Sequence, residues 1–189
     1  MNKRLWEVDA LRGVAILMMV IYHLLFDLSG FGGWDINVYS GFWRVFARIT
    51  ATLFIFLVGV SLTISLSNAQ LAAGSGKGLF AKYLKRGLGI LGWGLVVTLV
   101  TGLLFPEGTV IFGILHFIGL SVILAYPFRK LRVWNLALGL AALGLGLYLQ
   151  NVTVGFPWLL WLGLQPAHFS TFDYFPVLPW FGVTLLGLF

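Results

Sequence analysis

The sequence predicts an all-α integral membrane protein, a bundle of about six transmembrane helices with a cytoplasmic N-terminus and an aromatic interfacial segment before the last span. Apolar residues make up 60% of the chain, charged residues only 10%, and the mean hydropathy is +0.98. A soluble domain carries roughly 25% charged residues, so lipid must solvate most of this surface. The apolar runs are long and do not alternate with polar residues, which favours helices over strands.

Breaks between the apolar runs define the expected spans. Glycine-rich residues 29–33 end the first span, a linker of small residues with a basic end covers 69–86, and Pro106 stops the third span. The segment 151–174 is aromatic and broken by proline, which is typical of structure at a membrane surface. The spans are therefore expected at about 8–28, 42–67, 87–105, 111–128, 133–149 and from about 176 onward.

The positive charges indicate the topology. If six spans alternate, ten of the twelve Lys and Arg residues share one side, and the positive-inside rule places that side in the cytoplasm. The other two, Arg44 and Arg48, lie at the start of span two. The ten are Lys3, Arg4, Arg12, Lys77, Lys82, Lys85, Arg86, Arg129, Lys130 and Arg132.

Composition also excludes several kinds of site. The chain has no cysteine, which excludes disulfides, thiolate metal sites and a cysteine nucleophile. In a membrane protein the net charge of +6 reports topology and does not indicate nucleic-acid binding, and no metal is expected. Residues 1–189 are interpreted as a single membrane domain. Because the last span is still apolar at Phe189, we expect the natural chain to continue or this sequence to be a shortened form.

Span one carries a stripe of ionisable residues. Arg12 and His23 are eleven residues apart, which places them about 20° apart around a helix, and Asp27 follows one turn beyond His23. An ionisable residue inside a membrane costs at least a few kcal/mol and is a functional hypothesis by default. Neutral His23 could act as a general base, with Asp27 holding its tautomer and stabilising the protonated ring.

Each member of the stripe has a structural alternative. His23 could be a buried histidine bonded to a carbonyl of a neighbouring helix, and Asp27 could be a solvated span end. Arg12 could extend to the cytoplasmic headgroups. These alternatives stay open at the level of the sequence.

Arg44, Arg48 and His116 are further candidates for donor or substrate binding. The two arginines lie one turn apart, where they could bind an anionic group or pair with Asp27 or Asp35. His116 lies between Gly113 and Gly119, so its alternative role is an interhelical hydrogen bond at a close helix contact. The glycines of spans three and five are interpreted as packing faces: Gly87, Gly89, Gly92, Gly94, Gly139, Gly144 and Gly146.

The N-terminal segment, with Asp9, Leu11-Arg12 and a histidine eleven residues after that arginine, resembles the opening of the heparan-alpha-glucosaminide N-acetyltransferase catalytic-domain family. It is also similar to the wider group of membrane acyltransferases. The resemblance covers almost the whole chain, and its further segments are residues 54–61, 113–119, 179–182 and 186–187.

The resemblance implies acyl transfer across a membrane. Cytoplasmic acyl-CoA, with acetyl-CoA as the expected donor, would acylate an extracytoplasmic sugar or glycan. His23 would deprotonate the acceptor, Arg12 would lie near the donor, and basic loops would attract the CoA phosphates. Small bacterial relatives imply a multi-pass protein of the bacterial plasma membrane. Membrane lipids are expected partners, and a homo-oligomer stays open because six spans are few for a full tunnel.

Two other functions stay open. His23 and His116, at similar depth, could be axial ligands of a b-type haem. The glycine- and proline-broken segments would also permit a small-molecule or lipid transporter, although no series of carboxylates marks an ion pathway.

Overall fold

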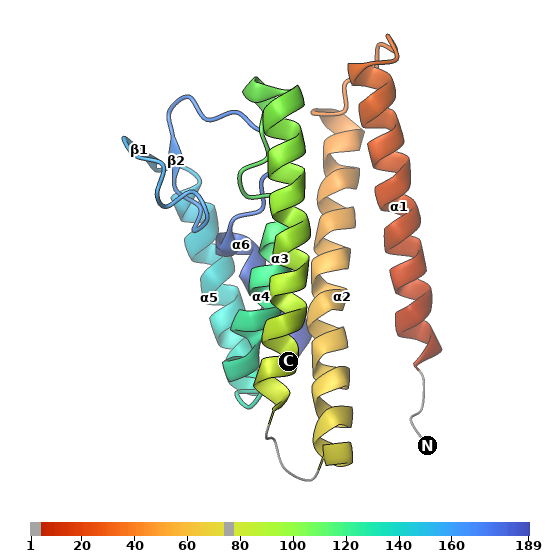
Figure 1. The fold of residues 1–189 in the computed structure, drawn as a ribbon, viewed down its shortest axis with the longest axis vertical. Coiled ribbons are helices and arrows are strands. Elements are labelled where there is room, and N and C mark those ends of the chain that lie inside the picture. The colour runs from red at the N-terminus through yellow and green to blue at the C-terminus, as the bar shows by residue number, and fades with distance from the viewer. Residues whose placement is uncertain (1–4, 74–77) are drawn as a thin grey trace. The chain divides into compact units, whose positions relative to one another are not determined.

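The computed structural model describes residues 5–73 and 78–189, which contain six α-helices (Figure 1). Three of them are long and apolar enough to cross a membrane, and the other three are shorter apolar helices. The predicted helical fold with six apolar segments is therefore confirmed. The helices are α1 (Trp6–Gly30), α2 (Gly41–Ala73), α3 (Leu79–Leu104), α4 (Ile114–Phe128), α5 (Val133–Leu149) and α6 (Val177–Leu188).

The third span begins earlier than predicted. Residues 79–86 were expected to be linker, but they form the first turns of α3. These turns are amphipathic: Leu79 and Tyr83 are buried, whereas Lys82 and its basic neighbours are exposed. The basic residues lower the mean hydropathy of these turns, although their apolar face packs as part of a helix. On that face the Tyr83 hydroxyl lies 2.8 Å from Ser65 Oγ of α2. The predicted linker centre at 74–76 lies outside the described residues. The same holds for three of the basic residues used for the topology: Lys3, Arg4 and Lys77.

The chain divides into two compact units, residues 1–57 and 58–189, and the division falls within α2. The predicted single domain stays a prediction. In the first unit, α1 buries only Ala15 among its described side chains, and large apolar residues such as Leu17 and Leu24 are exposed. A helix of this kind is suited to lipid rather than water. Its C-terminus is closed by the Phe31 amide, which donates to the Asp27 carbonyl at 2.8 Å.

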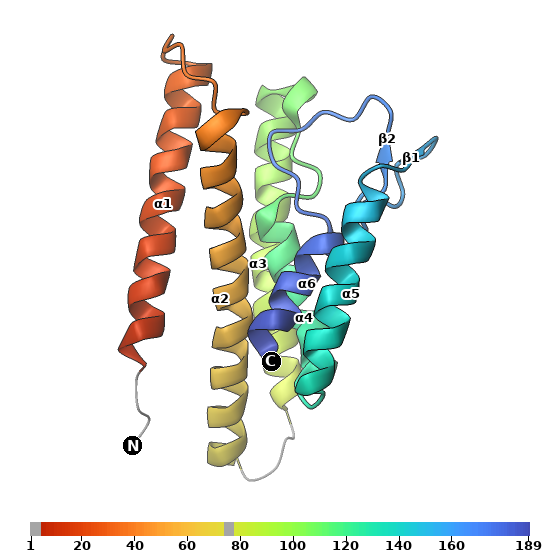
Figure 2. The same ribbon diagram turned by 180° about the vertical axis from the view of Figure 1, so that it is seen from behind.

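The second unit combines the C-terminal part of α2 with two helix pairs. α3 packs against α4, α5 packs against α6, and α4 contacts α6, so that α4 and α6 form the centre of the unit (Figure 2). The Phe128 and Phe181 rings meet edge to face across that central contact, with centroids 5.4 Å apart. The core of this unit therefore lies on its two most buried helices.

Glycines determine how closely these helices approach. A methyl group on Gly182 of α6 would lie 2.6 Å from the Gly139 carbonyl of α5, and one on Gly119 of α4 would lie 2.8 Å from the Gly87 carbonyl of α3. Small residues at such contacts allow van der Waals packing between backbones, which drives helix association in lipid. The packing prediction is wrong for three glycines that face open space: Gly89, Gly92 and Gly144.

The aromatic segment between α5 and α6 contains no helix, and its predicted place at a membrane surface stays a prediction. It contains two short parallel strands, β1 (Thr153–Val154) and β2 (Gln165–Pro166). The Val177 amide donates to the Trp161 carbonyl at 2.8 Å, and the Leu178 amide donates to the Leu162 carbonyl at 3.1 Å. These bonds attach the segment to the start of α6.

Candidate active site

The tautomer of His23 follows from its hydrogen bond within α1. The side chain is exposed, and Nδ1 lies 2.9 Å from the carbonyl oxygen of Met19, one turn earlier. A carbonyl oxygen only accepts, so we assign the proton to Nδ1 and a lone pair to Nε2. In the neutral ring this tautomer presents, at Nε2, the lone pair that a general base needs. The alternative of a buried histidine bonded to a neighbouring helix is wrong.

Met19, rather than Asp27, holds this tautomer. Asp27 is exposed at the C-terminal end of α1, on the same helix face as His23 but without a hydrogen bond to it among the described residues. Its carboxylate could still stabilise a protonated ring through space. The catalytic role of Asp27 stays a prediction.

Arg12 forms an ion pair on α1. Its Nη1 lies 2.8 Å from Asp9 Oδ1, and both side chains keep more than a third of their surface exposed. An exposed pair of this kind contributes at most about 1 kcal/mol to stability. Because α1 is continuous, the predicted common face of Arg12 and His23 is present in the structure.

Arg44 and Arg48 are exposed in the first turns of α2. Within the residues that the structure describes, neither forms the ion pair with Asp27 or Asp35 that the sequence left open. Their role in binding an anionic group stays a prediction.

His116 is buried in the second unit, and both of its ring nitrogens have partners. The Gly113 amide donates to Nδ1 at 3.2 Å, and Nε2 lies 3.2 Å from Thr98 Oγ1 on α3. Thr98 donates its own proton to the Val110 carbonyl at 2.6 Å, so it accepts from Nε2–H. The ring lies against Gly94, where an added methyl group would be 3.0 Å from Cγ.

This geometry supports the interhelical role that the sequence offered for His116. An axial haem ligand must present a free ring-nitrogen lone pair, and the Gly113 amide occupies the one that His116 has. Substrate binding by His116 stays a prediction, and it would require one of these bonds to break. The described residues also contain no cluster of three or more His, Asp or Glu side chains that could hold a metal ion.

In the second unit, the loop that precedes α4 pairs with the segment that precedes α6. The Phe172 amide donates to the Gly108 carbonyl at 3.1 Å, and the Phe175 amide donates to the Phe112 carbonyl at 2.9 Å. Asp173 Oδ2 accepts from the Ile114 amide at 2.8 Å, which places a carboxylate at the positive end of the α4 dipole. Asp173 therefore caps a helix 59 residues away in sequence.

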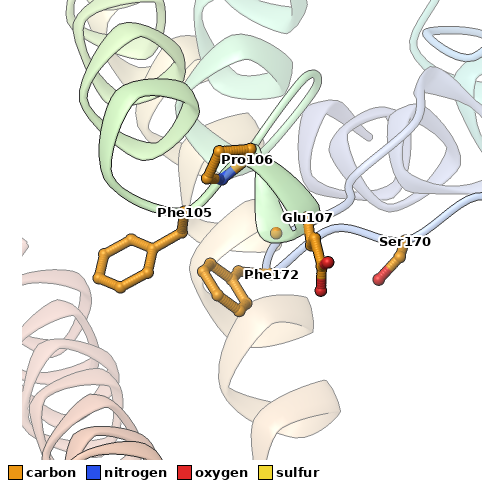
Figure 3. A pocket seen from close by; sticks show the side chains of 6 residues that line it. Phe105, Pro106, Glu107, Ser170 and Phe172 are labelled. Carbon is orange, nitrogen blue, oxygen red and sulfur yellow. The ribbon is translucent and has the colours of Figure 1, made fainter.

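An open depression of about 540 Å³ lies between these loops (Figure 3). Its first side is the 3-10 turn η1 (Pro106–Gly108), and its second side is the segment that pairs with it. Neither side was predicted as a site from the sequence. The lining residues are Phe105, Pro106, Glu107, Gly108, Ser170 and Phe172.

Tyr174 lies beside this loop pairing with its hydroxyl directed inward. The hydroxyl donates to the Leu160 carbonyl at 2.7 Å. Burial raises the pKa of Tyr174 to about 12, against a smaller lowering by the hydrogen bond with the Gln165 side chain. The folded protein therefore holds this phenol in its neutral form beyond the pH at which an exposed tyrosine ionises.

We expect ionisation of Tyr174 at high pH to lower the stability of the fold. The folded pKa is raised, so the contribution of Tyr174 to stability is complete below the unfolded pKa of about 10 and is lost as pH rises through about 12. The stability difference between the native protein and Tyr174→Phe should shrink over that range. Thermal unfolding of both at a series of pH values measures it. Tyr148→Phe makes the same chemical change at an exposed tyrosine and serves as the control for the substitution itself.

Comparison with known proteins gives a family but no close relative. No curated protein and no solved structure matched the chain. The family model described as heparan-alpha-glucosaminide N-acetyltransferase, catalytic, matches residues 4–189, which is nearly the whole sequence. The chain therefore belongs to this family of membrane acetyltransferases.

Proposed function

We propose that this protein transfers an acetyl group from cytoplasmic acetyl-CoA to a saccharide on the extracytoplasmic side of a bacterial plasma membrane. Family membership over residues 4–189 is the observation that carries the proposal. The apolar helices of transmembrane length support a multi-pass location. The charge distribution of the sequence supports the sidedness, since the predicted loops on one side hold most of the Lys and Arg residues.

In the proposed reaction, His23 acts as the general base. The acceptor amine or hydroxyl attacks the thioester carbonyl carbon of acetyl-CoA, and its proton passes to Nε2 of His23. The new bond to nitrogen or oxygen forms as the carbon–sulfur bond breaks, and the CoA thiolate then takes a proton. Asp27 stabilises the transient imidazolium. Arg12, Arg44 and Arg48 are candidates to bind the donor phosphates, because guanidinium groups match phosphate geometry.

The direct test combines purified protein with acetyl-CoA and three acceptors: glucosamine, N-acetylglucosamine and glucose. The chain has no cysteine, so a thiol reagent measures released CoA without background from the protein. We expect CoA release that depends on the acceptor, with the acetylated sugar identified by mass spectrometry. CoA release at the same rate with and without each sugar would contradict transfer to a saccharide.

A further inference from the structure

The turn between α4 and α5, residues 129–132, carries three cations on a backbone fixed by hydrogen bonds. The Phe128 carbonyl accepts from the Leu131 amide at 3.0 Å and from Asn135 Nδ2 at 3.1 Å. Asn135 is fully buried, so it attaches this basic turn to the packed part of α5. The backbone that carries the cations is therefore in place before any ligand arrives, which lowers the entropic cost of binding. The three cations are Arg129, Lys130 and Arg132.

Arg129 stacks on a group of aromatic rings. Its Cζ lies 3.8 Å from the centroid of the Tyr126 ring, and its Nη1 donates to the Tyr126 carbonyl at 2.8 Å. The Tyr126 ring contacts Phe80 and Tyr83, with centroids 5.1 Å and 6.4 Å apart, so the start of α3 lies at the same end of the unit as the basic turn (Figure 2). Among the described residues, the buried Nε of Arg129 has no hydrogen-bond acceptor. A guanidinium whose donors the protein does not all satisfy is suited to an anionic ligand.

The second unit supplies no carboxylate side chain to neutralise these cations. Residues 58–189 contain only two acidic side chains, Glu107 and Asp173. Glu107 follows the C-terminus of α3, and Asp173 caps the N-terminus of α4, whereas the basic turn follows the C-terminus of α4. The 15 residues of α4 separate these ends by about 20 Å, which is about twice the Debye length. The dipole of α4 offsets only about half a charge, so a net positive charge is left for a ligand.

An exposed apolar surface adjoins the basic turn. Val133 and Trp134 at the start of α5 are 70% and 69% exposed, and Phe80 on α3 is 46% exposed. Tryptophan beside Lys and Arg at the end of an apolar helix is typical of a membrane–water interface. A ligand that fits both features needs a phosphate for the cations and hydrocarbon chains for the apolar side chains. A soluble phosphate ester such as CoA meets only the first requirement.

We propose that the basic turn binds the headgroup of an anionic phospholipid, whose acyl chains lie along the adjoining apolar surface. The phosphate accepts hydrogen bonds from the Arg129 guanidinium and is paired with the charges of Lys130 and Arg132. Val133 and Trp134 contact the chains. The positive-inside rule places this turn at the cytoplasmic face, where anionic lipids attract basic segments next to a span. The site does not depend on the proposed acetyl transfer.

Lipid binding to the purified protein tests the site. The protein in a neutral detergent is titrated with dioleoylphosphatidylglycerol or dioleoylphosphatidylcholine, and native mass spectrometry measures the bound fraction. We expect phosphatidylglycerol to bind about tenfold more tightly, because each nearby cation contributes up to about fivefold in affinity for an anionic lipid. Lys130→Gln/Arg132→Gln should remove this preference. Both side chains are exposed, so the fold should be kept, and Arg129 with its stacked ring is left intact.

Lys82→Gln/Lys85→Gln is the matched control, since it removes the same two charges from the same end of the unit. Both lysines are exposed. By helical spacing, each lies at least about 100° around α3 from Phe80 and Tyr83, the residues that contact Tyr126. They therefore point away from the proposed headgroup. We expect the affinity of this variant for phosphatidylglycerol to change by less than about twofold.

A second pair of variants tests the apolar part of the site. Trp134→Ala should weaken binding of phosphatidylglycerol several-fold. Trp93→Ala should not, although Trp93, within α3, has the same exposure of 69%. Equal effects of the two tryptophan substitutions would contradict the placement of the acyl chains and overturn the proposal.

Two further outcomes would overturn the lipid site. The first is a variant of the basic turn that binds phosphatidylglycerol as the native protein does, or no more weakly than the lysine control. The second concerns CoA, which tests whether these cations hold a soluble phosphate instead. We expect Lys130→Gln/Arg132→Gln to change the affinity for CoA by less than about twofold. A loss for CoA as large as the loss for phosphatidylglycerol would refute the lipid site.

Discussion

Replacing His23 by alanine is expected to lower the rate of acetyl transfer by about 10²- to 10⁴-fold, the usual contribution of a positioned general base. Nε2 is the nitrogen that carries the lone pair, since Nδ1 donates to the Met19 carbonyl. Alanine removes this base and leaves the acceptor to lose its proton to water. The measurement is the rate of CoA release in the presence of the acceptor sugar.

The fold should tolerate this change. His23 is exposed and its hydrogen bond lies within its own helix, so neither a packed core nor an interhelical bond depends on it. His168→Ala removes another exposed histidine and should keep full activity. His23→Gln retains a polar side chain of similar reach without a basic nitrogen, and it should be as inactive as the alanine variant. Native transfer rates in either His23 variant would refute the mechanism.

The helices were largely predictable because hydropathy reports burial in lipid directly. α5 coincides with its predicted range of 133–149, and α1 extends only two residues beyond its prediction at each end. The start of α3 was missed because a mean hydropathy over these turns combines the exposed basic residues with the buried Leu79 and Tyr83. The helical spacing of the two buried residues would have indicated the helix, but the mean value does not retain spacing.

The candidate site was predictable only where a single helix builds it. Arg12, His23 and Asp27 share a face because helical spacing fixes their azimuths. The Met19 carbonyl was missed because a backbone group leaves no signal in residue identity. No local pattern links His116 with Thr98, and the exposed groups around Glu107 meet only because two distant loops pair.

Residue identity did not distinguish the glycines of α5 either. Gly139 and Gly146 are seven residues apart, two turns of one face, and both contact α6. Gly144 lies on another face, where an added methyl group would find nothing within 4 Å. Periodicity along the helix, rather than the number of glycines, therefore identifies the contact.

Replacing Gly182 by alanine should lower the stability of the second unit by about 1–3 kcal/mol, the usual cost of overpacking a close contact. The added methyl group would lie 2.6 Å from the Gly139 carbonyl oxygen and 3.1 Å from the Leu143 amide nitrogen. Both are backbone atoms that no rotamer change can move, so α5 and α6 must separate along their contact. Thermal unfolding followed by circular dichroism measures the loss.

Gly144→Ala is the matched control, because it makes the same chemical change on the partner helix without a collision. Alanine has a higher helix propensity than glycine by up to about 1 kcal/mol, so this variant should be as stable as the native protein or more so. Only Gly182→Ala is therefore expected to lower stability, although both substitutions add the same methyl group. If Gly182→Ala unfolded at the same temperature as Gly144→Ala, the close backbone contact of α5 with α6 could not be what holds this pair together in lipid.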